Sequence, residues 1–522
     1  MEGVTDKMIR VLFALLPFAT LVAGFLVFRL SALMTAMLTC LVEFLVVILY
    51  YHAPLVHSIQ AGLWGNLTMW SVFILLWSGQ IFGQTFRATG LIPVLLDSFG
   101  AIVPANDRQG RALTMLSLLS GFVGTFNLYA VYPVAIPALA ELGFDGVQAA
   151  SGYLIYASWC IPFAGLFIGA VIASAATSLS VVEIARASGI LTIPLVFVSI
   201  FGTYKILRLR FFESRNQLLF WILSLSHVAG IVLFTQIWPQ YHELTLMSGS
   251  TIALVLLYFY GRQGQKQATP HDESAQIPGK PGNSSGSANC TYPLSTRLKA
   301  YVPLLIAICY AILTRVPAVS KILLGFEFHL AAWGFNPVKV NVFTAPALPI
   351  FIAIASCYLF RLKQANLVTD IVRGTKHGAS SLSTLLFGSA TVYLMVFTGQ
   401  IAFLGETVAS GGKTVYELLD SALIFLGGMT FGQGAPAVFL FSRMQMAPAV
   451  KLGLPLALLV GLVNLVAMGP TNAVKPALIR FAASLVNIRD RDRDIFRIGL
   501  YWGLVQILVT TFFFLILVRF WK

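Results

Sequence analysis

The chain has 522 residues, of which 58% are hydrophobic and 10% are charged, and its mean hydropathy is +0.84. A soluble domain of this composition would lack the polar residues that cover a protein surface, so a soluble enzyme or binding domain is excluded. The net charge of +14 comes from Lys and Arg residues in short loops between apolar runs. This distribution is typical of cytoplasmic membrane loops and argues against a nucleic-acid partner, so the composition predicts an all-α polytopic protein of the lipid bilayer.

Apolar runs long enough to cross a bilayer follow one another from the N-terminus. The first half is expected to contain spans at about residues 11–28, 32–50, 67–86, 190–207, 218–238 and 246–260. Residues 54–65 are more amphipathic, and the long segment 147–178 is interrupted at Pro162. No small-residue cleavage site follows the first run, which is therefore interpreted as a retained span rather than a removed signal peptide.

Two apolar stretches are broken by glycine and proline and are predicted to be re-entrant hairpins, at residues 111–140 and 418–450. The first contains Gly121, Gly124, Asn127, Pro133 and Pro137. In a bilayer such breaks are tolerated only where protein or a water-filled cavity surrounds the exposed backbone groups. Paired breaks in the two halves of a membrane protein are typical of the substrate site of a transporter.

Residues 261–298 differ from the rest of the chain because they are rich in Gly, Ser, Pro, Gln and Lys. Such a segment cannot bury enough apolar area to fold, so we interpret it as a flexible cytoplasmic linker between two halves. After it, spans are expected at about residues 300–313, 342–360, 377–403 and 498–518. Another span, at residues 452–487, is interrupted near Gly469, Pro470 and Pro476.

Short echoes between the halves predict an inverted repeat. Residues 78–81 (Ser-Gly-Gln-Ile) resemble residues 398–401 (Thr-Gly-Gln-Ile), and Thr125-Phe126 recurs as Thr430-Phe431. If each broken stretch enters and leaves on one side, about twelve helices cross the membrane and most Lys and Arg residues fall on the inner side. The predicted divisions are a first repeat at 1–215, two connecting spans at 216–260, the linker at 261–298 and a second repeat at 299–522.

The breaks contain backbone and side-chain groups that attract anions in general. Helix N-termini inside the membrane offer unpaired N–H groups and a positive dipole end, and such termini follow the breaks near Asn127, Gly434 and Thr471. Lys475 would add a full charge, with the alternative that it snorkels toward the inner surface together with Arg480.

Further hydrogen bonds to the substrate are predicted from eight polar side chains in or near the broken spans. These are Gln80, Asn127, Tyr129, Tyr132, Gln400, Gln433, Asn464 and Asn472. For each of them the alternative is a structural contact between helices or, for the tyrosines, an anchor of the hairpin.

Glu43 is the acidic residue placed well inside a predicted span. Removal from water disfavours a charged carboxylate, so Glu43 is the candidate carrier of a coupling proton; the alternative is an ion pair with a basic neighbour. His227 is a lone histidine on an apolar span and is interpreted as a packing residue. The five cysteines show no C-x-x-C spacing, and no H-E-x-x-H or G-x-S-x-G motif occurs. We therefore predict no disulfide, metal site, cofactor or enzyme activity.

From its first span to its last, the chain resembles the bacterial L-lactate permease family. The resemblance is carried by residues 133–136 (Pro-Val-Ala-Ile) with 142–144 (Leu-Gly-Phe), by the polar loop at 104–108, and by Asn464 with Pro476 in the broken eleventh span. It implies a secondary transporter of the bacterial inner membrane that takes up lactate, glycolate and similar monocarboxylates with protons, by alternating access. A homodimer is left open.

The chain departs from the pattern of that family in both hairpins. The family's acidic residue is absent from residues 124–132, and residues 432–436 read Gly-Gln-Gly-Ala-Pro where the family has a run of Ser, Thr, Asp and Asn. A family lysine falls on Asn472, three residues before Lys475. Other functions therefore stay open: transport of a different organic anion, a channel, or a sensor or assembly subunit that kept a transporter scaffold.

Overall fold

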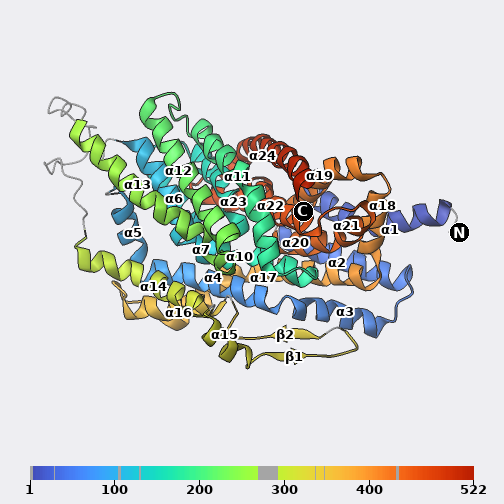
Figure 1. Cartoon of the computed structure of the whole chain (residues 1–522). Coiled ribbons are helices and arrows are strands. Elements are labelled where there is room, and N and C mark those ends of the chain that lie inside the picture. Colours follow the sequence, from blue (N-terminus) through green and yellow to red (C-terminus); the bar gives the residue numbers. More distant parts are fainter. Residues whose placement is uncertain are drawn as a thin grey trace.

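The computed structural model describes residues 4–521 except 29, 101, 104–106, 129–130, 268–291, 315, 336, 346 and 431–433. The described chain is almost entirely helical, as the composition predicts (Figure 1). The helices before the gap at 268–291 are α1 (Val4–Val22), α2 (Ala32–Leu49), α3 (Leu55–Thr68), α4 (Trp70–Ala88), α5 (Leu91–Gly100), α6 (Arg108–Phe122), α7 (Gly124–Asn127), α8 (Tyr132–Glu141), α9 (Gly146–Ala157), α10 (Ala164–Ala176), α11 (Val181–Ile206), α12 (Ser214–Val232) and α13 (Thr245–Gln267).

The elements after that gap begin with α14 (Leu294–Leu313) and end with the long helix α24 (Asp492–Phe520). Between them lie α15 (Pro317–Leu324), β1 (Phe328–Leu330), β2 (Val338–Val340), α16 (Ala347–Leu359), α17 (Leu367–Phe397), α18 (Gln400–Ala409), α19 (Lys413–Thr430), α20 (Gly434–Met444), α21 (Met446–Leu452), α22 (Leu456–Met468) and α23 (Pro476–Leu485). The predicted linker at 261–298 falls mostly outside the described residues, and its described ends continue α13 and lead into α14.

Seven described helices are long and apolar enough to cross a membrane, or up to nine if each of two bent helix pairs counts as one span. The bent pairs are α3 with α4 and α9 with α10, each bent by 54°. The second of these is the segment predicted to break at Pro162, so that break is confirmed. A polytopic membrane protein is confirmed as well, whereas the count of about twelve crossings stays a prediction.

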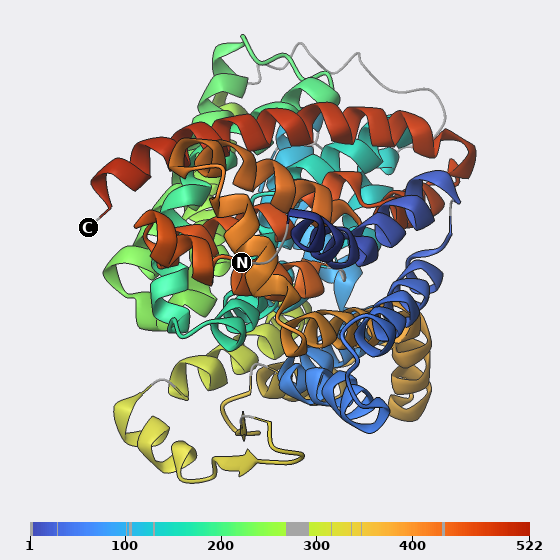
Figure 2. The same ribbon diagram turned by 90° about the vertical axis from the view of Figure 1, so that its right-hand side faces the viewer.

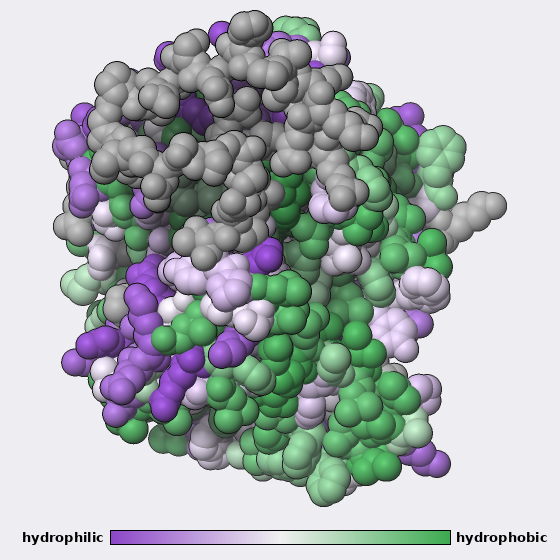
Figure 3. Space-filling view, turned by 90° about the vertical axis from the view of Figure 1, so that its left-hand side faces the viewer, coloured by the Kyte–Doolittle hydropathy of each residue, from purple (hydrophilic) through white to green (hydrophobic). Residues whose placement is uncertain are grey.

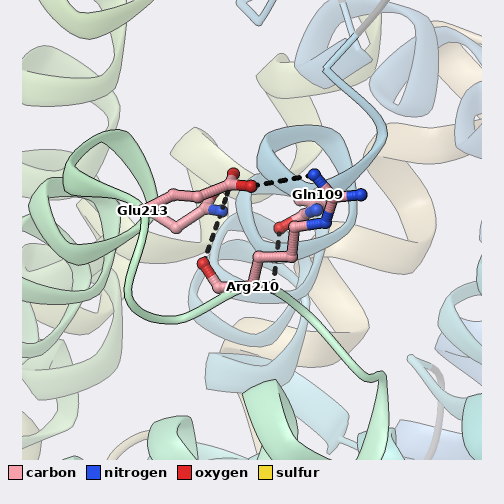
Figure 4. Close-up of polar contacts among 4 residues, drawn as sticks. Gln109, Arg210 and Glu213 are labelled. Carbon is pink, nitrogen blue, oxygen red and sulfur yellow. Dashed lines mark hydrogen bonds and ion pairs between the residues drawn. The ribbon is translucent and has the colours of Figure 1, made fainter.

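Both predicted hairpin regions are broken helices. The first consists of α6, α7 and α8, and the second of α19, α20 and α21. Helix α6 begins at Arg108, three residues before the predicted start, because the Asp107 side chain accepts a hydrogen bond from the N–H of Gly110 at 2.7 Å and caps the helix. Two further contacts hold this end: Arg215 pairs with Asp107 at 3.0 Å, and the N–H of Arg210 donates to Gln109 (Figure 4).

The two sequence halves interlock in space. Helix α17 packs along α2, α3 and α4, while α22 packs against α11 and α20 against α10. Close approach relies on small residues: a Cβ on Gly374 of α17 would lie 2.8 Å from Cα of Ile81, and one on Gly461 of α22 would lie 2.7 Å from Cβ of Ala187. Such packing is expected in a bilayer, where lipid tails are as apolar as side chains and van der Waals fit decides helix association.

Two local features differ from the sequence-based expectation. The predicted span 377–403 ends at Phe397, because Gly399 has a left-handed backbone (φ +73°) that separates α17 from α18, whereas the echoed residues 78–81 lie inside the continuous helix α4. In addition, β1 and β2 form an antiparallel hairpin before α16, so the predicted span 342–360 starts only at Ala347. This hairpin and α24 lie on opposite sides of the molecule (Figure 2).

The surface agrees with a protein surrounded by lipid. Large apolar side chains are exposed along several long helices, among them Leu508 (70%) and Phe512 (66%) on α24. On the side of the molecule where α13 and α14 lie, hydrophobic residues form a broad continuous area, and hydrophilic residues gather in one region of the same face (Figure 3). Apolar patches of this extent are not tolerated on soluble monomers.

The predicted orientation can be tested with cysteines at two exposed serines, in a background whose five native cysteines are replaced. Ser214 is the first residue of α12, at the end of a loop predicted to lie inside, and Ser410 follows α18 in a loop predicted to lie outside. We expect an impermeant thiol reagent added to intact cells to label Ser410→Cys and not Ser214→Cys. The opposite labelling pattern would show that the predicted orientation is inverted. Labelling of both cysteines would show that the predicted number of membrane crossings between the two sites is wrong.

Candidate functional site

The two hairpin breaks meet at a small buried cavity of about 50 Å³. Five parts of the chain line it: α4, the first hairpin, the break between α9 and α10, the start of α20 and the end of α22. The lining residues are Val72, Leu75, Leu76, Phe126, Leu128, Tyr132, Ile161, Ala164, Gly165, Ile168, Gly434, Ala435 and Met468. The prediction that the breaks in the two halves come together at one place therefore agrees with the geometry.

The start of α10, directly after the break, is kinked and has an unusual backbone. Gly165, Leu166 and Phe167 follow one another in the left-handed region, with φ values of +60°, +54° and +63°. Left-handed residues other than glycine cost of order 1–3 kcal/mol each and persist only where the surroundings fix them. Leu166 and Phe167 are both buried, which supplies that constraint directly beside the cavity.

Glycines let the broken helices approach one another at backbone distance. A Cβ on Gly469, at the end of α22, would lie 2.4 Å from the carbonyl oxygen of Ser158 in the neighbouring break. A Cβ on Gly434, at the start of α20, would lie 2.3 Å from Sδ of Met468 and 3.5 Å from Nζ of Lys475. Protein backbone and small residues thus surround the breaks, as the bilayer requires.

Lys475 is fully buried. It follows the 3-10 turn Pro470–Val474, and its ammonium donates to the carbonyl oxygen of Ala467 at 3.3 Å. Among the described residues it forms no ion pair with an acidic side chain. The alternative that Lys475 snorkels to the surface is therefore wrong, because its side chain points toward Gly434 and the cavity region while Arg480 is exposed.

Two more predicted site residues meet here across the sequence halves. The side-chain amide of Asn472 donates a hydrogen bond to the hydroxyl of Tyr132, a cavity-lining residue of the first hairpin. Asn464 lies one turn before Met468, but its side chain faces away from the cavity. Its amide donates a hydrogen bond to Ser188 at 3.2 Å, and its oxygen lies so close to Gly169 that a Cβ there would clash with it. In the structure Asn464 therefore makes the helix–helix contact that was its alternative.

The predicted residues Gln80, Gln400 and Glu43 do not line the cavity. Gln80 packs against Gly374 and Gly378 of α17. Gln400 begins α18, and its amide donates to the buried carboxyl group of Glu43 at 2.6 Å. Neither Oε2 of Glu43 nor Oε1 of Gln400 has a hydrogen-bond partner in the described part of the chain.

Three predicted residues are not fully described. Tyr129 and Gln433 lie outside the described residues, and only the backbone of Asn127 is described, as the last residue of α7. Gly434 is confirmed as the first residue of α20, directly after the second gap. The lone His227 accepts or donates a hydrogen bond at 2.9 Å to Ser117 of α6 and is buried, so it packs against the first hairpin as expected.

The sequence analysis missed a second acid inside the membrane protein. Asp420 of α19 is fully buried, accepts a hydrogen bond from the amide of Gln445 at 2.9 Å, and leaves Oδ2 without a partner among the described residues. Tyr416, one turn earlier, donates to the oxygen of Gln445. Asp420 lies in the second predicted hairpin and not in a predicted span; the apolar run at 418–426, which surrounds it, carried the signal.

Comparison with known protein families shows that the L-lactate permease family matches residues 10–521, nearly the whole chain. Among solved structures, the chain is similar to the YdaH transporter of Alcanivorax borkumensis, which has an unusual topology, with 14% sequence identity, 89% of each chain covered and a TM-score of 0.44. A similarity this low carries no argument about the site. A comparison with curated proteins found no significant match.

The close approach of Gly469 to a neighbouring break predicts the effect of a single methyl group. In Gly469→Ala the new Cβ would lie 2.4 Å from the carbonyl oxygen of Ser158, a backbone atom that cannot rotate away, so we expect the purified protein to unfold at a lower temperature, with overpacking costing about 1–3 kcal/mol. Gly62→Ala in α3 is the control, because its Cβ would meet only Ala390 at 3.8 Å. Equal melting temperatures for the two variants would show that the tight approach of α22 to the break after α9 is not needed.

Proposed function

Because this chain belongs to the L-lactate permease family, which consists of membrane transporters and not enzymes, we propose that it carries small monocarboxylate anions such as lactate or glycolate across the bacterial inner membrane. We propose further that transport is coupled to protons and proceeds by alternating access of inverted repeats. The observation that carries the proposal is the buried ammonium of Lys475 beside the cavity where the breaks meet.

The ammonium of Lys475 lacks a counter-charge from the described residues. A lysine at membrane depth costs roughly 2.5–3.5 kcal/mol on insertion scales, and such residues mark pairs or pathways. Lys475 is fully buried and has one carbonyl partner, at 3.3 Å, so two of its three N–H groups lack a described acceptor. A substrate carboxylate would supply both the charge and the acceptors.

The start of α20 reinforces the ammonium. This helix has 11 residues and begins at Gly434, whose position is adjacent to Nζ of Lys475 and lines the cavity. Its free N–H groups and positive dipole end favour an anion at the same place. Because Gly434 has no side chain, the ammonium of Lys475 can approach this helix start to 3.5 Å from the position that a Cβ would take.

The rest of the lining favours a small ligand with one charge. Apart from the Tyr132 hydroxyl, the described side chains around the cavity are apolar. One ammonium matches one carboxylate, whereas a dicarboxylate would bury a second, unpaired charge. The apolar side chains of α4 and α10 suit the methyl or methylene group of a 2-hydroxy acid, and the Tyr132–Asn472 pair suits its hydroxyl.

The anion site is tested by Lys475→Met with Lys451→Met as control, since Lys451 is exposed on α21. Removing a hydrogen bond to a charged group should weaken lactate binding by about 1.5–3 kcal/mol, which is roughly tenfold or more. We expect lactate and glycolate to raise the melting temperature of the wild type and of Lys451→Met and not of Lys475→Met. Uptake of labelled lactate into proteoliposomes should show the same order.

Retention of ligand stabilisation in Lys475→Met would place the binding site elsewhere. Stronger stabilisation by a dicarboxylate than by lactate would instead favour a different organic anion. Binding without any uptake would favour the sensor or assembly role.

Two buried carboxyl groups are candidates for the coupling proton. Glu43 has one amide donor, from Gln400, and Asp420 has one amide donor, from Gln445, and each leaves its second oxygen without a described partner. Neither carboxyl group forms an ion pair with a described basic side chain. When a buried carboxyl group without a fixed counter-charge loses its proton, it places an unpaired negative charge in an apolar environment. Proton binding and release therefore change the energy of this part of the protein strongly.

Neutral variants separate these two carboxyl groups. If Glu43 carries the proton, Glu43→Gln should abolish lactate accumulation driven by a pH gradient while lactate exchange at equal pH continues; Asp420→Asn is the parallel test for Asp420. Glu406→Gln is the control, because Glu406 is exposed at the end of α18. Gradient-driven uptake at wild-type level in both buried-site variants would contradict proton coupling through either group.

A further inference from the structure

The ends of α11 and α24 enclose a second, larger space that the transport proposal does not use. This groove has a volume of about 1240 Å³, and it opens on the side of the protein predicted to face the cytoplasm. Its walls are the last turn of α11, the first turns of α24 and the loop between α8 and α9. The residues that line it include Gly143, Asp145, Gln148, Lys205, Arg208, Arg491, Asp494 and Arg497.

The charges that face the groove are predominantly positive. Arg491 pairs with both acids, at 3.1 Å to Asp494 and 3.5 Å to Asp145, so these acids have a partner within the groove. Lys205, Arg208 and Arg497 form no ion pair with any described residue. Nearby Arg210 is not part of this set, because it pairs with Glu213 at 3.1 Å (Figure 4).

Aromatic residues lie one helical turn deeper in the same groove. On α11, Phe201 precedes Lys205 by four residues, and the ammonium of Lys205 lies 5.2 Å from the Phe201 ring centre. On α24, Tyr501 follows Arg497 by four residues, and its neighbour Trp502 packs edge-on against Phe201 at 6.3 Å. Since the groove contains the C-terminal end of α11 and the N-terminal end of α24, both helices place their basic residue outside and their aromatic residue toward the membrane centre.

We propose that this groove binds the phosphate headgroup of an anionic phospholipid of the inner leaflet. Helices α11 and α24 are both long, apolar spans, of 26 and 29 residues, so the groove lies at the end of two membrane-crossing helices. Basic pockets between such helices on the cytoplasmic side bind anionic headgroups, and aromatic residues occupy the interfacial layer below. Tyr501 is 63% exposed, which leaves a surface for the first methylenes of the acyl chains.

The groove favours a lipid over a free phosphate ion. The volume is several times that needed for one phosphate, and the polar rim continues into the aromatic and apolar surface of Phe201, Tyr501 and Trp502. A bound headgroup would join α11, α24 and the loop before α9 from three distant parts of the sequence. This assignment does not depend on which substrate the central cavity takes.

The test uses the full chain purified in detergent, with melting temperature and native mass spectrometry as readouts. Phosphatidylglycerol, phosphatidylcholine and soluble glycerol 3-phosphate are added separately to the wild type and to two double variants. Lys205→Gln with Arg497→Gln removes two groove charges, and Arg493→Gln with Lys451→Gln removes two exposed charges that do not line the groove.

We expect phosphatidylglycerol to stabilise the wild type and the control more than phosphatidylcholine does, and to be retained on them in native mass spectra. In the groove variant its binding should fall by about 25-fold, from about fivefold for each basic residue at the membrane surface. The charge-conserving variant Lys205→Arg with Arg497→Lys should keep the preference, which separates loss of charge from misfolding.

Three outcomes would overturn the proposal. The first is an unchanged preference for phosphatidylglycerol in the groove variant. The second is an equal loss in the control variant, which would indicate a general surface-charge effect. The third is stabilisation by glycerol 3-phosphate equal to that by phosphatidylglycerol, which would make the ligand a soluble phosphate ester.

Discussion

Backbone groups exposed by a broken helix cannot be left to lipid, and this constraint explains how the core of the protein is arranged. The structure meets it by bringing breaks from distant parts of the chain together, so that each is covered by others. Gly469 of one break reaches the carbonyl of Ser158 in another, and Gly434 reaches Met468 beside a third. This requirement also explains why the two sequence halves interlock. The breaks at 161–167 and 469–475 can cover each other only if helices of one half pack between helices of the other half. The cavity is the small volume left between them.

The buried charges are separated according to their sign. Lys475 belongs to the break region. Glu43, on α2, is held by Gln400 of α18, and Asp420 is held by Gln445, which follows the second break. Had an acid paired with Lys475, the two charges would have neutralised each other and an incoming anion would have gained little. Leaving the ammonium unpaired by described side chains is costly for folding, and under the proposed function this attraction is available to a substrate carboxylate. The acids, each held by a glutamine amide, can then change protonation without a fixed ion pair opposing the change.

The sequence predicted the class of fold and the positions of the breaks, because hydropathy and Gly/Pro patterns act locally and bilayer physics allows few responses. It did not predict which polar residues converge. Tyr132 and Asn472, which are 340 residues apart in the sequence, form a hydrogen bond, while Gln80 and Asn464 face neighbouring helices. Which way a side chain faces depends on the rotation of its helix about its own axis. A segment that is apolar on all sides has no periodic pattern from which this rotation could be predicted. Asp420 lies in a stretch whose strongest sequence signal is its glycine and proline residues, which indicate a break and not a buried acid. The β1–β2 hairpin is too short to leave a strand pattern.

The hydrogen bond from Asn472 to Tyr132 joins the first hairpin to the broken helix of the second half, at the edge of the cavity. Any motion that separates these two elements has to break it. A single neutral hydrogen bond contributes about 0.5–1.5 kcal/mol net, which changes an equilibrium by about twofold to tenfold. The contact is thus too weak to hold these two elements together by itself. A ligand whose hydroxyl took the place of the Tyr132 partner would exchange one hydrogen bond for another, so its binding would release the link between the first hairpin and the broken helix at little cost in energy.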